Sequence, residues 1–186
     1  MSHVKGLVLL SRFDYLEKKE GPAVLREFLI KISTDETNFT RQPVDGANLY
    51  PGTLLGQVDQ LLLDEYFTEE EEFHQLGEWN AQNLIDRFFN LYMQEKKPIE
   101  LLNQYARLRE LLIGSGIMNI IVKDSHNISV VIDYGQNIPK SVCLSEQGFI
   151  SGAMKLCGAK EVKIIENDCA ASGQAFACKF DISYSQ

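Results

Sequence analysis

Near its C-terminus the chain reads ENDCAASGQAFACKFDISY over residues 166–184. Every second side chain in the later part of this stretch is apolar or aromatic, at Phe176, Cys178, Phe180, Ile182 and Tyr184. Successive side chains of a β-strand point to opposite faces, so this alternation predicts a half-buried strand over 176–184. The run at 161–165 predicts the strand before it. The segment between them, which begins at Cys169 and contains Gly173, then reverses the chain.

The same stretch carries groups that bind zinc. Glu166 and Cys169 lie at the exit of the first predicted strand, and Cys178 lies on the returning one. Cys143 comes from the start of the preceding predicted helix. Zinc prefers thiolates, tolerates one carboxylate and fills four positions in a structural site. The spacing therefore predicts a metal site at Cys143, Glu166, Cys169 and Cys178, and the alternative of cysteines as small buried hydrophobic residues stays open.

The residues before this stretch predict two more strands and a short helix. Residues 117–122 and 128–133 are apolar and β-branched, with the polar segment 123–127 between them, which is typical of strand, turn and strand. A short helix is predicted over 149–156. Gly148 and Gly152 each cost about 1 kcal/mol relative to alanine inside a helix. We therefore expect a close neighbour of the backbone there, either a packed strand or a ligand.

The first two-thirds of the chain predict helices. Apolar residues about three apart at Leu7, Leu10, Phe13 and Leu16 indicate one apolar helix face. Further helices are predicted over 23–32, from Pro51, from about Asn80 and from Pro98, with a loop over 33–48. Thr68 and the four glutamates at 69–72 are typical of a capped, solvated helix start.

Together these elements predict an α+β fold, in which helices pack on one antiparallel sheet of four strands. We expect a single domain over 1–186, with a helical part at 1–114 and a sheet part at 115–186. The length of 186 residues and the apolar content of 45% suffice for one core.

Composition limits the partners and the compartment. The net charge of -8 and the pI near 4.9 argue against nucleic acid, since phosphate binding needs a basic face. The first apolar run, over 6–10, is too short for a signal peptide or a membrane span, so we expect a cytoplasmic protein. In a reducing cytosol four cysteines are thiols, metal ligands or core residues more often than disulfides.

The stretch from Cys143 to Ile182 resembles the 4-vinyl reductase domain. The matching residues are Cys143, Gly148 and Gly152, then Glu166-x-x-Cys169-x-x-x-Gly173, then Cys178-x-Phe180-x-Ile182. The similarity is greatest to the copy in the sensor part of bacterial transcription activators that respond to aromatic compounds. In that group the matching cysteines and glutamate bind a structural zinc, so the resemblance implies zinc here. This chain has one residue more between the last two cysteines.

The effector of those activators does not carry over to this chain. They read it with a histidine and a tryptophan upstream of the zinc ligands, whereas His74 and Trp79 lie too far from Cys143 to match. The ligand therefore stays open.

The N-terminal stretch over 5–21 resembles haem nitric-oxide/oxygen-binding domains and a related bacterial family. With the C-terminal match, this implies the ligand-binding fold shared by those sensors, 4-vinyl reductase domains and transport-protein-particle subunits. Haem binding in that family needs a proximal histidine on a central helix and a Tyr-x-Ser-x-Arg motif. The chain has only His3, His74 and His126, and the segment that begins at Tyr105 and ends at Arg109 lacks the serine. We expect no haem.

Our main hypothesis is a non-enzymatic sensory or regulatory module that binds a small apolar or aromatic molecule. A group of aromatic and methionine side chains is core by default, but lines a cavity between helices and sheet if one is open. The candidate pocket residues are Phe88, Phe89, Tyr92, Met93, Tyr105, Met118 and Phe149. The chain shows no output domain, so we expect a signal to pass to a protein partner or through a homodimer.

Two alternatives remain from the sequence. One is an interaction subunit that resembles transport-particle components, dimerises through its helices and has a closed pocket. The other, suggested only by the domain's name, is an accessory enzyme of tetrapyrrole metabolism. The sequence has no recognisable nucleophile arrangement, and a fold alone does not confer activity. We expect that the chain is not an enzyme.

Overall fold

The computed structural model describes residues 3–33, 38–88, 97–114, 116–173 and 175–185, with the side chains of 85–88 excluded. Its chain forms two compact units. Unit 1 comprises residues 1–69 and 111–114, and unit 2 comprises residues 70–110 and 115–186. This division differs from the expected one at residue 114, because the helices over 72–88 and 98–112 group mainly with the sheet. That residues 1–186 form a single domain stays a prediction.

Unit 1 combines helices with a small antiparallel sheet. Its elements are β1 (His3–Lys5), α1 (Gly6–Glu20), α2 (Pro22–Ile32), β2 (Leu49–Pro51) and α3 (Gly52–Glu65). Gly21 separates α1 from α2 as predicted, while Pro51 caps α3 instead of entering its first turn. The described residues of the predicted loop over 33–48 lie outside helices and strands.

The apolar face predicted for α1 is wrong in part. Val8, Leu9, Phe13 and Leu16 are buried, whereas Leu7 and Leu10 are half-buried. Arg12 explains the rotation of this face, because its Nε lies 3.1 Å from Oδ1 of Asp59 on α3 and both side chains are buried. A buried charge needs its partner, so α1 must present Arg12 to α3.

The helix that we predicted from Asn80 begins earlier, as α4 (Glu72–Phe88). Thr68 does not start it: residues 68–71 form turns, in which the Phe73 N–H donates to the Glu70 carbonyl at 3.0 Å. Phe73 and Leu76 are buried at helical spacing near the start of α4. Glu72, the last of the four glutamates, is the first residue of α4 and is buried, so the expected solvated helix start holds only in part.

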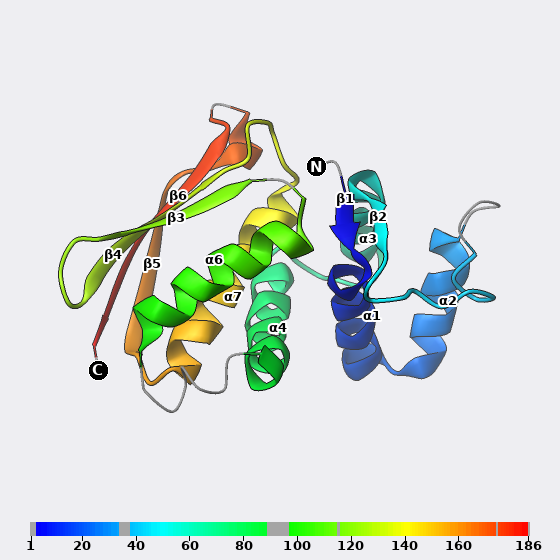
Figure 1. The fold of residues 1–186 in the computed structure, drawn as a ribbon. Coiled ribbons are helices and arrows are strands. Elements are labelled where there is room, and N and C mark those ends of the chain that lie inside the picture. The colour runs from blue at the N-terminus through cyan, green and yellow to red at the C-terminus, as the bar shows by residue number, and fades with distance from the viewer. Residues whose placement is uncertain (1–2, 34–37, 89–96, 115, 174, 186) are drawn as a thin grey trace. The chain divides into compact units, whose positions relative to one another are not determined.

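Unit 2 confirms the α+β class and the four-stranded antiparallel sheet. Its elements are α4, α6 (Pro98–Leu112, through Glu110), β3 (Ile117–Val122), β4 (Asn127–Asp133), α7 (Lys140–Leu156), β5 (Lys160–Asp168), the 3₁₀ turn η1 (Ala170–Ser172) and β6 (Ala177–Ser185). The strand order is β3-β4-β6-β5, every pair antiparallel. Figure 1 shows α4, α6 and α7 on one side of this sheet.

The alternation that predicted β6 holds over the strand itself. Cys178, Phe180, Ile182 and Tyr184 are buried on its inner face. Phe176 is an exception, with 62% of its surface exposed. It precedes the strand, and its carbonyl accepts the Tyr134 N–H at 2.9 Å, so the chain is still completing its turn there.

The helix predicted over 149–156 is longer and begins at Lys140, as α7. The close neighbour of its glycines is helix α4, neither a strand nor a ligand. A Cβ on Gly148 would lie 1.9 Å from the backbone oxygen of His74, and one on Gly77 of α4 would lie 2.1 Å from that of Ser145. Glycine at these positions lets the backbones of α4 and α7 approach each other closely.

Candidate metal centre

Three elements of unit 2 bring the predicted ligands together. Cys143 lies in the first turn of α7, Glu166 near the end of β5, Cys169 directly after β5, and Cys178 on β6 opposite Ile132 of β4. Register shifts in β5 between Glu166 and Asp168, so the strand carries a β-bulge. A bulge bends its strand and re-aims the following side chains. The bulge thus lets the side chains of Glu166 and Cys169 both point toward the cluster.

The ligand atoms are close enough for one metal ion. One atom from each of the four residues lies within 4.8 Å of the others. The Sγ of Cys143 lies 3.5 Å from that of Cys169, 3.6 Å from that of Cys178, and 2.7 Å from Glu166 Oε1. Thiolates at about 2.3 Å from a tetrahedral zinc stand about 3.8 Å apart. The sulfur positions therefore suit zinc after small movements, and Glu166 Oε1 must move outward.

Each ligand also accepts a hydrogen bond from outside the cluster. Gln147 Nε2 lies 3.6 Å from Cys143 Sγ, and the backbone N–H of Ala170 lies 3.3 Å from Cys178 Sγ. Lys140 Nζ lies 3.0 Å from Glu166 Oε2 and 3.8 Å from Cys169 Sγ. Donors of this kind stabilise thiolates and carboxylates, and hydrogen bonds to metal ligands from outside the site hold those ligands in place. The surroundings suit anionic ligands better than inert buried thiols.

The electrostatics of the cluster follow from these contacts. The sulfur–sulfur hydrogen bond and burial raise the pKa of Cys143 well above its usual range, and the same bond lowers the pKa of Cys178 against the effect of burial. Burial acts to raise the pKa of Glu166, but hydrogen bonds from Cys143 and Lys140 leave it lowered. A metal ion that binds these thiols must displace their protons.

The remaining cysteine, Cys157, lies outside the cluster. It caps α7 at the end opposite to Cys143, about 21 Å away along the helix at 1.5 Å per residue, and is buried. None of the four cysteines forms a disulfide. Cys157 therefore offers an internal control for any experiment on the other three.

Three of the predicted pocket residues fall within the described side chains. Tyr105 of α6, Met118 of β3 and Phe149 of α7 are all buried in unit 2. The rings of Tyr105 and Phe149 stack with centroids 3.9 Å apart. Phe88 ends α4 but its side chain is not described, and Phe89, Tyr92 and Met93 lie outside the described residues. The structure brings the first three to one side of the sheet.

A buried ion pair beside this stack was missed by the sequence reasoning. Arg109 of α6 and Glu146 of α7 are 0% and 3% exposed, and Arg109 Nε donates to Glu146 Oε1 at 2.5 Å. The Tyr105 hydroxyl donates to the other carboxylate oxygen at 2.9 Å, and burial raises its pKa. The sequence offered one indication of this pair. Tyr105 and Arg109 are four residues apart, so both lie on the helix face that packs in the core.

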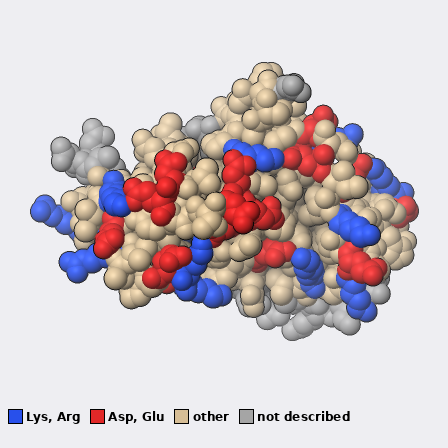
Figure 2. Space-filling model, turned by 180° about the vertical axis from the view of Figure 1, so that it is seen from behind, with Lys and Arg blue, Asp and Glu red and all other residues tan. Residues whose placement is uncertain are grey.

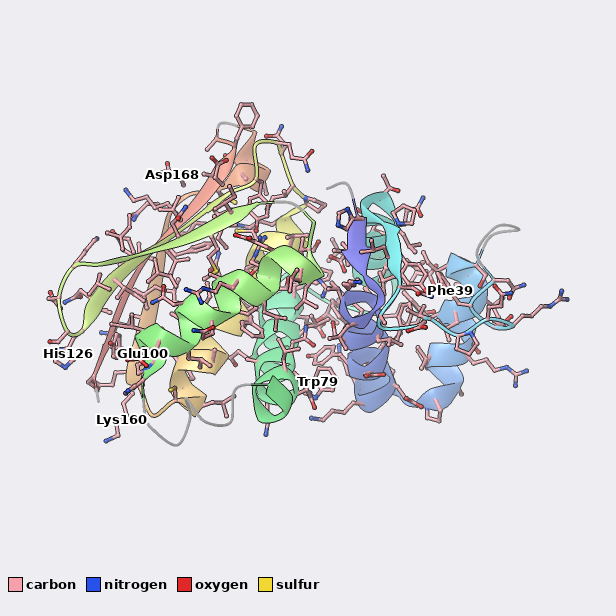
Figure 3. The ribbon with its side chains drawn as sticks, viewed as in Figure 1. Phe39, Trp79, Glu100, His126, Lys160 and Asp168 are labelled. Atoms are coloured by element: carbon pink, nitrogen blue, oxygen red, sulfur yellow. The ribbon has the colours of Figure 1, made fainter. Side chains whose placement is uncertain are left out.

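Unit 2 has two histidines among its described residues, and neither is fully buried. Haem iron is held by an axial side chain, most often histidine. His126 is exposed in the β3–β4 turn, at the other end of the sheet from Asp168 (Figure 3), His74 lies half-buried beside Glu71, and His3 belongs to unit 1. The region between α6, α7 and the sheet holds the stacked rings and the ion pair. Absence of haem stays a prediction.

Charged side chains are mixed over the face seen in Figure 2. Lysine and arginine occur there singly or in small groups among aspartate and glutamate. A phosphate backbone needs a continuous basic surface. That the chain does not bind nucleic acid stays a prediction. Over the part of the chain that the structure describes, no helix has the length and apolar character needed to cross a membrane.

Comparisons with known proteins show the fold. No family model and no curated protein matches the chain. Among solved structures, an Fe(II) unliganded H-NOX protein from K. algicida is 14% identical, with a TM-score of 0.73 over 98% of this chain and 97% of that one. An H-NOX protein from S. oneidensis in the Fe(II)NO state is 15% identical, with a TM-score of 0.68 over 98% and 99%. A mutant H-NOX from T. Tengcongensis is 12% identical, with a TM-score of 0.72 over 98% of both chains. The chain therefore has the fold of these H-NOX structures.

Proposed function

We propose that this chain is a non-enzymatic sensor module that binds a small apolar or aromatic molecule and contains a structural zinc. The zinc site is proposed from one observation: the ligand atoms of Cys143, Glu166, Cys169 and Cys178 lie within 4.8 Å of one another. The sensor role is supported by the H-NOX fold over 98% of the chain and by the resemblance to 4-vinyl reductase domains.

The zinc would stabilise the folded state of unit 2. Its ligands come from the start of α7, the end of β5 and the middle of the sheet, so one ion would tie the β5–β6 connection to the helix. A metal that binds only the folded state adds its binding energy to folding. Four protein ligands leave no open position for chemistry, which is why we propose a structural and not a catalytic role.

The ligand would bind in unit 2, against the inner face of the sheet. Tyr105, Met118 and Phe149 are buried in unit 2 and would line the site, and Phe88, Phe89, Tyr92 and Met93 complete the predicted set. Apolar sites with a few polar groups are typical of small-molecule binding, and Glu146 and Arg109 supply polar groups here. A protein partner or a second copy of the chain would read the bound state.

Native mass spectrometry of the purified protein, with metal analysis of the same sample, tests both parts. We expect one zinc per chain and, in a fraction of molecules, an additional small-molecule mass. A chain that retains no metal after growth and titration with zinc would contradict the zinc proposal. A chain that retains no ligand and is not stabilised by any compound of an aromatic library in thermal unfolding would contradict the sensor proposal.

One observation favours a second candidate, an interaction subunit with a closed pocket. The stack of Tyr105 on Phe149 and the buried pair of Arg109 with Glu146 fill space that a ligand would need. In addition, the edge strand β3 exposes Ile117, Ile121 and Val122. Exposed apolar edge strands favour pairing with another chain. Dimerisation that depends on concentration, in protein free of ligand, would favour this candidate in analytical ultracentrifugation.

A further inference from the structure

Lys140 opens α7 and contacts two of the four proposed ligands. Its Nζ lies 3.0 Å from Glu166 Oε2 and 3.8 Å from Cys169 Sγ, and its side chain is 38% exposed. Lys140, Cys143 and Gln147 are spaced by three and four residues, which places them on one face of the helix. The start of α7 therefore supplies one ligand and two donors to the same cluster.

The positive charge of Lys140 is important because the proposed metal centre carries a net negative charge. Three thiolates and one carboxylate around a divalent ion leave a net charge of about two negative units. Two further donors to the cluster, the amide of Gln147 and the backbone N–H of Ala170, are uncharged. Lys140 is the donor that brings a positive charge, because a lysine side chain is a cation at neutral pH.

The two oxygens of Glu166 have different neighbours. Oε2 accepts from Lys140, while Oε1 lies 2.7 Å from Cys143 Sγ, inside the group of ligand atoms. A carboxylate held by one oxygen in this way presents the other oxygen alone. Outer partners of this kind orient metal ligands, and their loss typically costs about 10–100-fold in metal affinity.

We infer that Lys140 is a positioning residue of the metal centre, and this inference rests on the zinc proposed above. Lys140 holds Glu166 so that only Oε1 binds the metal, and it offsets the negative charge of the four ligands. It acts through Glu166 and Cys169 and does not itself bind zinc.

The test compares zinc affinity among variants of the full chain, by competition with a chromophoric chelator at neutral pH. Lys140→Met removes the charge and the donor, and Lys140→Arg keeps both. Lys155→Met is the matched control: Lys155 lies on the same helix, and its Nζ lies 2.7 Å from Glu78 Oε1, away from the cluster. We expect Lys140→Met to weaken zinc about tenfold or more, and both other variants to stay within about threefold of the wild type.

Two readouts separate positioning from a general effect on folding. With cobalt(II) in place of zinc, the ligand-field bands report the coordination, and we expect Lys140→Met to change them while Lys155→Met does not. The ratio of affinities between wild type and Lys140→Met should also shrink as salt rises, because a partly exposed charge is screened.

The outcomes distinguish this inference from the zinc proposal. A wild-type chain that binds no zinc overturns both. A wild-type chain that binds one zinc, with Lys140→Met matching Lys155→Met in affinity and in its cobalt spectrum, overturns the role of Lys140 alone.

Discussion

At the scale of single residues, the sequence grouped the four candidate metal ligands but not the buried ion pair. Glu166, Cys169 and Cys178 are close in sequence, Cys143 joined them through the predicted helix start and the resemblance to the 4-vinyl reductase domain, and the structure brings the four together. Arg109 and Glu146 are 37 residues apart, and each resembles an ordinary surface charge in the sequence. Only the packing of α6 on α7 shows that they meet.

Replacing Cys169 by serine should remove the zinc and destabilise unit 2. At a zinc concentration a hundred times the dissociation constant, binding contributes about 2.7 kcal/mol to the free energy of unfolding. We expect a loss of about that size in the presence of zinc, measured by thermal or denaturant unfolding. Cys157→Ser is the control and should keep one zinc per chain, because Cys157 lies outside the cluster. Equal metal content in the two variants would contradict the assignment.

Replacing Arg109 by methionine should leave the carboxylate of Glu146 buried without its cation. Breaking a buried pair in this way costs about 3–5 kcal/mol, because a charge then lacks its counter-charge. The double variant Arg109→Met with Glu146→Leu should recover much of the loss. Denaturant unfolding of the two single variants and the double variant forms a double-mutant cycle. A double variant as unstable as the sum of the single ones would show that the two residues do not interact.

At the scale of helices and strands, the sequence predicted the types of element better than their limits. The four strands of unit 2 lie where alternation and β-branched runs placed them, because such patterns are local. The starts of α4 and α7 were missed by eight and nine residues respectively, taking residues 80 and 149 as the predicted starts. The two helices touch at His74 and Gly77 of α4 and at Ser145 and Gly148 of α7, and such contacts between distant segments leave no local signal.

Replacing Gly148 by alanine tests that contact. Alanine is better than glycine inside a helix by about 1 kcal/mol, so propensity alone predicts a gain. The new Cβ would lie 1.9 Å from the backbone oxygen of His74, and backbone cannot swing aside as a side chain does. Overpacking costs about 1–3 kcal/mol or more, so we expect a net loss in the free energy of unfolding.

Gly46→Ala is the control for Gly148→Ala. A Cβ at Gly46 would meet the flexible Leu10 side chain at 3.4 Å, which is ordinary contact. Its stability should stay within about 0.5 kcal/mol of the wild type. A Gly148→Ala protein that is more stable than the wild type would show that α4 moves away from α7 without cost.

At the scale of the whole molecule, the α+β class followed from the change of period along the chain, from helical before residue 114 to alternating after it. The grouping of α4 and most of α6 with the sheet did not follow, because it depends on which apolar faces meet. Low identity to H-NOX structures, at 12–15% for those described above, shows how little of the fold is fixed by particular side chains.

Removing zinc should destabilise unit 2, and the single tryptophan reports it. Trp79 lies on α4 within unit 2. A chelator should therefore move the midpoint of the Trp79 fluorescence transition to lower denaturant concentration, because the metal's binding energy no longer adds to folding. The Cys169→Ser protein, which lacks the site, should show no shift on the same treatment. Identical shifts in both proteins would indicate an effect of the chelator unrelated to the cluster.

The β5–β6 connection has a consequence for tracing the relatives of this chain in genomes. Cys169 is fixed by the end of β5 and Cys178 by its pairing with Ile132, while the segment between them donates to the cluster at Ala170 and turns at Gly173 with a φ of 75°. Insertions or deletions in this turn would leave both sulfur positions unchanged. A search that requires the ligand types and their strands, but leaves the turn length open, should recover homologues that a fixed-spacing motif discards.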